Sequence, residues 1–377
     1  MKIQRVALED FMLFDQLQVD FSPHINIISG ENSTGKTALL KLLYTCAFCN
    51  MEKRQDQLRY EEAGTKGYST LLRNDEYILL PKLEGVYGPD ISAIELISSK
   101  SKGPAKVSLS FYDCGKPFSF SLYQDSPPKI EIPDSGLEAS DVVFIPTKEM
   151  ISATEHYASL YKRYHINFDE TYYDLASLLD SPRKKELSEK KLTEVSAQLE
   201  RWIGGKLLCE GKTFYLETSQ GKMNMKLVSE GYRKFATLLN LVSTGTLMNG
   251  TILFWDEPET NLNPKMTRSL VSVLVSLAAA GVQVFVTTHD YFVQQYFGLA
   301  AEYGEKYQPG NGNLQYRFFS LDRDGEHQEE AEHSREPGGV SIDWASQLEN
   351  LKHNAVSEEY DALYDREMGL LYDNNAE

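Results

Sequence analysis

Short apolar runs separated by polar positions open the chain and predict three strands, over residues 3–8, 17–21 and 25–29. The third run ends at Gly30, and residues 38–47 that follow have the composition of a helix. Residues 50–80 are polar and weakly patterned. A stretch punctuated by Gly and Pro, from 83 to 146, favours further strands, of which the last covers 142–145.

The second half of the chain alternates between helical and strand-like patterns. Residues 150–203 are helical in pattern, 204–227 favour turns and a hairpin, and 231–243 favour a helix. An apolar strand at 251–255, a helix at 264–279 and a second apolar strand at 282–287 follow. Strands that alternate with helices imply an α/β fold with a largely parallel sheet. A last amphipathic helix is predicted at 356–372.

The charge is concentrated at one end of the chain. Of the net charge of −17, residues 326–377 carry −11, with fourteen acidic and three basic side chains. A general electrostatic footprint for DNA is therefore absent, although a local basic patch stays possible. With 377 residues, 41% hydrophobic, the composition excludes disordered and collagen-like proteins, and four cysteines are too few for a disulfide scaffold. No secretory signal and no membrane span is expected, so the cytoplasm is the predicted location.

Residues 30–37 (GENSTGKT) match the phosphate-binding pattern G-x-x-x-x-G-K-[ST] in full, between a predicted strand and a predicted helix. In such a loop, backbone N–H groups surround phosphate oxygens, and the helix N-terminus adds its positive dipole end. Lys36 is expected to reach the β- and γ-phosphates and Thr37 to ligate Mg²⁺. The predicted ATP-binding residues of this loop are Gly30, Asn32, Ser33, Thr34, Gly35, Lys36 and Thr37.

Acidic and imidazole side chains follow two later apolar strands. The strand at 251–255 leads into Asp256 and Glu257, where ligands bind in open α/β sheets. Asp256 is predicted to hold Mg²⁺ and Glu257 to polarise the attacking water. His289 follows the strand at 282–287 and is predicted to sense the γ-phosphate. The alternatives are an ordinary acidic turn and a structural histidine.

These motifs resemble those of ABC-type ATPases of the SMC/RecF/OLD-like branch over nearly the whole chain. The loop at 30–37 stands as Walker A and ILFWDEPETNLNP as Walker B with the D-loop. LVSEGY at 227–232 resembles the ABC signature, so the resemblance implies that Ser229 and Gly231 contact ATP held by the opposite subunit. Asn263 stands where transporter-type relatives have Asp, and no Q-loop glutamine is found after residue 145.

The resemblance also implies a domain layout and a homodimer or higher oligomer formed around ATP. The predicted parts are an N-terminal ATPase lobe (1–149) with an antiparallel β subdomain, a short helical insertion (150–206), a C-terminal lobe (207–325) and an acidic tail (326–377). The insertion is too short for an SMC coiled-coil arm. Asp322 and Asp324 form a D-x-D pair like that of a TOPRIM nuclease, but the pattern around them favours a β-hairpin turn.

Stand-alone ATPases such as AriA of PARIS and PtuA of Septu are similar and act in anti-phage defence with a separate effector. The resemblance therefore implies an ATPase that senses or regulates a separate effector, a nuclease or a toxin. The effector is expected to contact the insertion or the acidic tail, with the insertion preferred because in the family it projects from the ATPase core. One alternative is a RecF-like repair ATPase that binds DNA directly, although the charge does not indicate this. Another is a scaffold or antitoxin that binds nucleotide without hydrolysing it.

Overall fold

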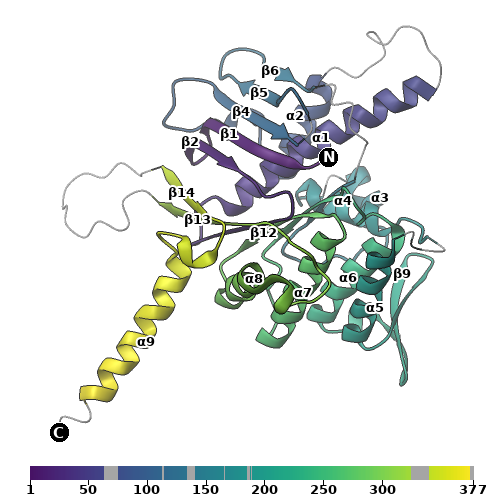
Figure 1. Cartoon of the computed structure of the whole chain (residues 1–377). Coiled ribbons are helices and arrows are strands. Elements are labelled where there is room, and N and C mark those ends of the chain that lie inside the picture. The colour runs from purple at the N-terminus through teal and green to yellow at the C-terminus, as the bar shows by residue number, and fades with distance from the viewer. Residues whose placement is uncertain are drawn as a thin grey trace.

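A mostly parallel sheet of six strands lies at the centre of the computed structural model, which describes residues 1–62, 75–112, 114–133, 141–164, 166–184, 187, 189–323 and 339–373 (Figure 1). Its order is β14-β13-β3-β12-β11-β7, and only β14 runs antiparallel to its neighbour. The strands are β3 (Ile25–Gly30), β7 (Val142–Ile145), β11 (Ile252–Asp256), β12 (Gln283–Thr288), β13 (Tyr316–Arg323) and β14 (Val340–Ala345). The predicted α/β fold with a largely parallel sheet is confirmed.

The central sheet is buried on both faces, which explains the unbroken apolar runs of its strands. Along β11 the side chains alternate between two cores: Leu253 and Trp255 point to one, and Ile252 and Phe254 to the other. The first core also contains the buried faces of α6 (Glu230–Thr244), α7 (Pro264–Ala279) and α8 (Tyr291–Tyr303). The second contains the first turns of α1 (Lys36–Glu62), the helix that follows β3.

An antiparallel sheet shares this second core with α1. Its order is β2-β1-β4-β5-β6, with β1 (Ile3–Phe11), β2 (Phe14–Asp20), β4 (Ala105–Phe111), β5 (Phe118–Leu122) and β6 (Lys129–Glu131). Buried and more exposed positions alternate along β4, as they do in a sheet with one covered face. This sheet corresponds to the antiparallel β subdomain predicted in the N-terminal lobe. Strands β4, β5 and β6 come from the β-rich stretch at 83–146, and β1 and β2 come from the start of the chain.

Helices occupy most of the described part of residues 50–87, where the sequence shows little pattern. Helix α1 continues to Glu62, and α2 (Asp75–Tyr87) packs beside it. Leu79, Leu83 and Val86 give α2 an ordinary buried face, but Lys82 is also only 4% exposed. Because residues 83–87 belong to α2, their interpretation as the start of a β-rich region is wrong. The buried Lys82 interrupts the apolar spacing by which this helix could have been predicted.

The helical insertion consists of α3 (Tyr157–Tyr164), α4 (Glu170–Leu179) and α5 (Lys190–Ile203), and a small antiparallel sheet follows it: β8 (Lys206–Glu210), β9 (Thr213–Thr218) and β10 (Gly221–Asn224). Helices α4 and α5 bury Leu175, Leu179, Val195 and Leu199 in the first core.

A buried polar cluster also ties α4 to the ATPase lobe. Lys82 Nζ lies 2.5 Å from an Asp174 carboxylate oxygen, which also accepts a 2.7 Å hydrogen bond from the Tyr44 hydroxyl of α1. Burial lowers the pKa of Lys82, but the Asp174 and Glu170 carboxylates outweigh it, and the net direction is upward. Helices α4 and α5 therefore belong to the packed body, and the expectation that the insertion projects is wrong for them. The boundaries at 149, 206 and 325 stay a prediction.

The predicted last helix is present as α9 (Ala355–Asp373) and points away from the body (Figure 1). It follows the antiparallel pair β13 and β14 at the edge of the central sheet. No helix within the described ranges is long and apolar enough to cross a membrane.

Candidate active site

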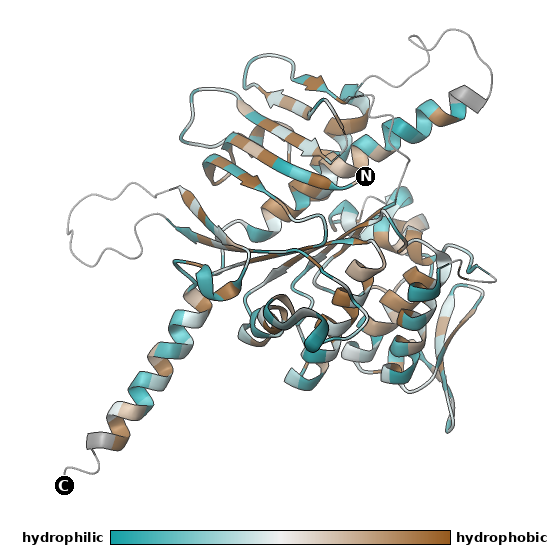
Figure 2. Ribbon diagram, viewed as in Figure 1, coloured by the Kyte–Doolittle hydropathy of each residue, from teal (hydrophilic) through white to brown (hydrophobic). Residues whose placement is uncertain are grey.

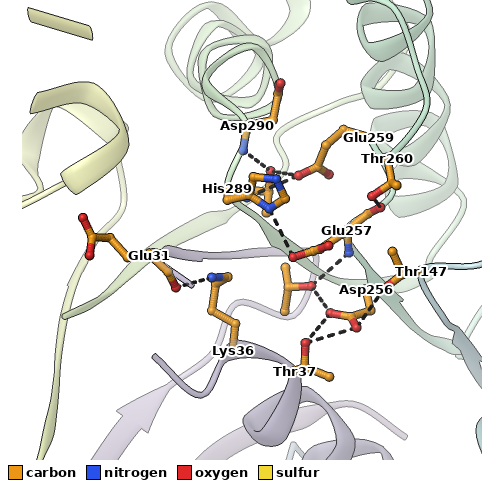
Figure 3. A network of polar contacts seen from close by, with 12 residues as sticks. Glu31, Lys36, Thr37, Thr147, Asp256, Glu257, Glu259, Thr260, His289 and Asp290 are labelled. Atoms are coloured by element: carbon orange, nitrogen blue, oxygen red, sulfur yellow. Dashed lines mark hydrogen bonds and ion pairs between the residues drawn. The ribbon is translucent and has the colours of Figure 1, made fainter. Parts of the chain in front are cut away.

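The carboxyl ends of β3, β7, β11 and β12 meet at one edge of the central sheet because these strands are parallel. The loop at 30–37 follows β3, Asp256 ends β11, His289 follows β12 and Thr147 lies shortly after β7. Figure 3 shows these side chains converging from different elements. Segments more than 200 residues apart in the sequence thus form one polar site, where ligands bind in open α/β sheets.

The phosphate loop has the backbone shape that its glycines predict. Gly30 and Gly35 have φ values of 141° and 91°, and Ser33 is left-handed at 64°. A Cβ atom on Gly30 would lie 2.3 Å from the carbonyl oxygen of Leu321, so no larger residue fits there without movement of β13. Asn32 and Ser33 are exposed. The Thr34 hydroxyl donates to the Glu31 carbonyl and closes the turn.

Lys36 begins α1 and folds back over this loop. Its ammonium group donates to the carbonyl oxygens of Gly30 (2.7 Å) and Glu31 (2.6 Å). Burial lowers the pKa of Lys36, while the carboxylates of Glu257 and Asp256 act in the opposite direction. The ammonium group is therefore held inside the loop by two carbonyl acceptors, at the position where the motif predicts phosphate oxygens.

Oxygen ligands suited to Mg²⁺ gather around Asp256, which is only 6% exposed. The hydroxyl of Thr37 lies 2.9 and 3.1 Å from its two carboxylate oxygens, and the hydroxyls of Thr147 and Thr287 lie at 3.2 and 2.6 Å. Mg²⁺ prefers such hard oxygens and is commonly held by one or two carboxylates together with substrate phosphates. Asp256 and Thr37 therefore fit a magnesium ion held partly by ATP.

Glu257 and His289 face each other beside this cluster. The His289 Nδ1 atom lies 3.1 Å from a Glu257 carboxylate oxygen, and both side chains reach solvent. Glu257 has φ at 45°, a left-handed conformation that a non-glycine residue rarely adopts. The backbone N–H of Glu257 donates to the Thr287 hydroxyl. The carbonyl oxygen of Glu257 accepts from both the N–H and the hydroxyl of Thr260. Neighbouring threonines thus hold a strained backbone that aims the carboxylate into the site.

Three participants escaped sequence reasoning: Thr147, Thr287 and Glu259. Thr147 follows the strand after which a Q-loop glutamine was sought, and its hydroxyl donates to Asp256 instead. Glu259 is 6% exposed, and one of its oxygens accepts from the Thr288 hydroxyl (2.6 Å) and the His289 N–H (3.2 Å). Burial raises the pKa of Glu259. The position of Glu259, two residues after Glu257, could have marked it as a candidate site residue. Only the turn at 257–260 shows that its side chain points to the His289 loop.

Glu259 positions the His289 loop, so its removal should impair turnover more than nucleotide binding. In Glu259→Ala the Thr288 hydroxyl and the His289 N–H lose their acceptor, and we expect the kcat for ATP hydrolysis to fall about 10- to 100-fold. Glu259→Gln keeps the accepting oxygen and should retain most of the activity. Steady-state kinetics of both variants, with thermal unfolding to check that they are folded, make the test. A wild-type kcat in Glu259→Ala would contradict this role.

Within one chain, the structure shows no contact between the signature residues Ser229 and Gly231 and the phosphate loop, as far as the described residues go. Ser229 is the N-cap of α6, is exposed and makes no capping bond with its side chain. Gly231 is buried, and a Cβ there would lie 2.6 Å from Met266 and 2.9 Å from Leu262. Among the described residues, no hydrogen bond joins either to the loop at 30–37. Gly231 lies instead beside Leu262 and Met266, in the segment that follows Glu257 along the chain.

Lys234, one turn along α6, ties the signature helix to that segment. Its ammonium group donates to the carbonyl oxygens of Pro258 (3.1 Å) and Thr260 (2.7 Å). Burial lowers its pKa to about 8. Lys234 therefore fastens the loop after Glu257 to the N-terminal half of α6.

Asn263 and Asp322 have structural roles. The Asn263 carboxamide oxygen accepts the N–H of Met266 and caps α7, with Pro264 at the first helical position. Asn and Asp cap helices equally well, which accounts for Asn at this D-loop position. Asp322 lies within strand β13, opposite Ser341 of the antiparallel strand β14, and not in the hairpin turn that the sequence predicts. Asp324 lies outside the described residues.

Comparison with known proteins assigns the chain that contains this site to a family. A family profile described as "AAA domain, putative AbiEii toxin, Type IV TA system" matches residues 25–293. The chain belongs to this AbiEii-type AAA family. The match contains the phosphate loop, Asp256, Glu257 and His289, so the chain is a P-loop ATPase domain.

The chain also has a local sequence similarity to RecF and a weak structural similarity to SMC head domains. It is 38% identical over 53 residues to the DNA replication and repair protein RecF of Halalkalibacterium halodurans, 14% of each chain, so it matches a small part of that relative. The SMC head domain from Thermotoga maritima is 13% identical, covers 91% of this chain and 98% of its own, with a TM-score of 0.46. An Smc head domain derived from Pyrococcus furiosus is 10% identical, covers 97% and 99%, with a TM-score of 0.49.

Proposed function

We propose that this chain binds Mg²⁺-ATP at the carboxyl edge of its central sheet, hydrolyses it with help from a second copy, and thereby controls a separate effector. The convergence of Lys36, the Thr37–Asp256 pair and the Glu257–His289 pair carries the enzymatic part of this proposal. In that order, Lys36 and the two pairs supply three tasks of phosphoryl transfer: neutralising charge, holding the metal and orienting water.

The mechanism follows from what these side chains do. Lys36 exchanges its two carbonyl acceptors for phosphate oxygens, and the backbone N–H groups of the loop surround the same phosphates. Thr37 and Asp256 hold Mg²⁺, which when bound neutralises charge on the phosphates. The Glu257 carboxylate accepts a hydrogen bond from the attacking water and aligns it. The Nδ1–H group of His289 donates to that carboxylate, and Glu259 fixes the loop on which His289 lies.

A second copy would complete the site through the signature helix. The N-terminus of α6 is open, since Ser229 is exposed and its side chain makes no cap. Exposed apolar side chains surround it, with Leu227 77% and Tyr232 40% exposed. A helix N-terminus of this kind binds anions, and an apolar rim suits burial against another subunit. These features support the head-to-tail pairing that the family resemblance implies.

The effector part of the proposal draws on the family. Its description names a toxin and a type IV toxin–antitoxin system, which supports action with a second component, as in anti-phage defence. A phage-challenge experiment tests this with three strains. The first expresses the chain alone, the second expresses it with the product of its neighbouring reading frame, and the third expresses the Lys36→Ala variant with that product. We expect protection only from the wild-type pair. Nuclease activity or toxicity of the purified chain alone would overturn the regulatory role.

The likeness to RecF favours a second candidate function, direct binding of duplex DNA in repair or replication. The net charge of −17 opposes it. A gel-shift assay over a salt series separates the two, because contacts with phosphates weaken steeply as salt rises. A strong, salt-dependent shift of duplex DNA in the presence of ATP would favour the RecF-like function. Nucleotide binding without turnover would instead favour a scaffold or antitoxin.

A further inference from the structure

Helix α9 carries an apolar stripe beyond the packed body (Figure 2). The stripe follows helical spacing through Tyr360, Leu363, Tyr364 and Leu370, which are 43%, 60%, 62% and 62% exposed. With nineteen residues the helix is about 28 Å long at the α-helical rise. Single exposed apolar residues are ordinary on protein surfaces, but a stripe along one helix face marks an interaction site.

The opposite face of α9 is acidic. The helix contains six acidic residues and one basic one: Glu358, Glu359, Asp361, Asp365, Glu367 and Asp373, with Arg366. Glu367 is the exception in position, since it lies four residues after Leu363 and three before Leu370, within the apolar stripe. An occupant of this face must therefore provide an apolar surface, a cation opposite Glu367 and basic groups at its rim.

The charge argues against a second α9 as that occupant. Each helix carries a net charge of −5, and two stripes placed together would bring their two Glu367 carboxylates into the same apolar contact. The helix also contains Gly369, which weakens an isolated helix relative to alanine. A helix of this length without tertiary packing is marginal in water, so a bound groove would stabilise it.

The base of α9 rests on the helix that begins at the candidate active site. The ring of Tyr360 stacks on Tyr291 at 3.9 Å between centroids, and the Asn354 amide donates to Gln294 at 2.8 Å. Both Tyr291 and Gln294 lie in the first turn of α8, which starts two residues after His289. The nucleotide-sensing loop and the exposed stripe are thus joined by one short helix.

We propose that α9 is the docking helix for the effector, which receives its apolar face in a groove with a basic residue opposite Glu367. The proposal rests on the proposed function, and it assigns the contact to α9 instead of the insertion. Helices α4 and α5 are buried against the body. Two of the three α3 rings are already stacked, Tyr157 on Tyr161 and Tyr161 on Tyr173. The partner class is a cationic protein, and nucleic acid is excluded as the occupant by the charge of the helix.

The test uses the full chain and the protein encoded by the neighbouring reading frame, purified separately. Binding is measured by isothermal titration calorimetry with wild type, with Leu363→Ala/Leu370→Ala, with Glu367→Arg and with Asp365→Ala as the matched control on the acidic face. We expect the first two variants to raise the Kd at least about tenfold and the control to change it less than about threefold. ATPase rate and oligomeric state, which depend on other surfaces, should stay at wild-type values in all variants.

The location of the contact is checked by a photo-crosslinking amino acid placed at Leu363 or Leu370. The expected product is a crosslink to the effector near a Lys or Arg, and changing that residue to Glu should restore binding by Glu367→Arg. A crosslink to a second copy of the chain or to its own body would overturn the proposal. Tight effector binding that ignores the α9 variants would overturn it and leave the proposed function standing. No effector binding by wild type would overturn both.

Discussion

Glu257→Gln should leave ATP bound and uncleaved. The amide keeps the size of the side chain and its place 3.1 Å from the His289 ring, but it is a far weaker hydrogen-bond acceptor for the attacking water. Loss of a general base costs about 10²- to 10⁴-fold in rate, and we expect kcat to fall within that range. Thr37 and Asp256, which hold the metal, are unchanged. Rapid filtration with labelled ATP measures the bound nucleotide and its state.

Lys36→Ala provides the contrasting variant. It removes the charge that Gly30 and Glu31 hold inside the phosphate loop, so both nucleotide binding and turnover should be lost. The two variants therefore separate binding from cleavage. Turnover by Glu257→Gln at the wild-type rate would show that another group aligns the water.

Mixing two inactive variants should recover activity if the signature acts across a subunit boundary. Ser229→Arg places a large cation at the exposed N-terminus of α6, and Lys36→Ala disables the phosphate loop. A hybrid dimer would contain one interface with both defects and one with neither. If the two interfaces fire independently, an equal mixture should reach about a quarter of the wild-type rate, because half the dimers are hybrid and each has one intact site.

The matched control for this mixture is Lys36→Ala with Lys36→Ala/Ser229→Arg. That pair has no combination of intact loop and intact signature, so it should stay inactive at every ratio. Equal inactivity of the test mixture, with hybrid dimers demonstrated by native mass spectrometry, would contradict independent sites completed in trans. Full activity of Ser229→Arg by itself would contradict any catalytic contribution of the signature.

The sequence predicts those parts of the site in which local pattern and long-range geometry coincide. The motif at 30–37 defines its own loop shape, because glycines and a following helix are enough to produce it. Asp256 and His289 follow apolar runs long enough to be buried parallel strands, whose carboxyl ends necessarily meet at one edge. The α/β fold and the joining of these residues therefore follow from elementary sheet geometry.

Other features depend on tertiary packing that no local pattern records. Thr147 and Thr287 reach Asp256 only because β7 and β12 flank β11, and threonine is too common near strand ends to be a signal. Lys82 lies on the buried face of α2, where the sequence pattern leads one to expect an apolar residue. Its charge is compensated there by Asp174, which lies far along the chain. The packing of α4 and α5 against α6 and α7 likewise depends on contacts between distant segments.

The rate of ATP hydrolysis per chain, measured over a wide range of protein concentration with Mg²⁺, tests the central claim most directly. If the site between 30–37 and Glu257 cleaves ATP only when a second copy supplies Ser229, the specific rate should rise with concentration to a plateau and be absent in Lys36→Ala. A full specific rate in dilute monomer, or an undiminished rate in Lys36→Ala, would contradict the account.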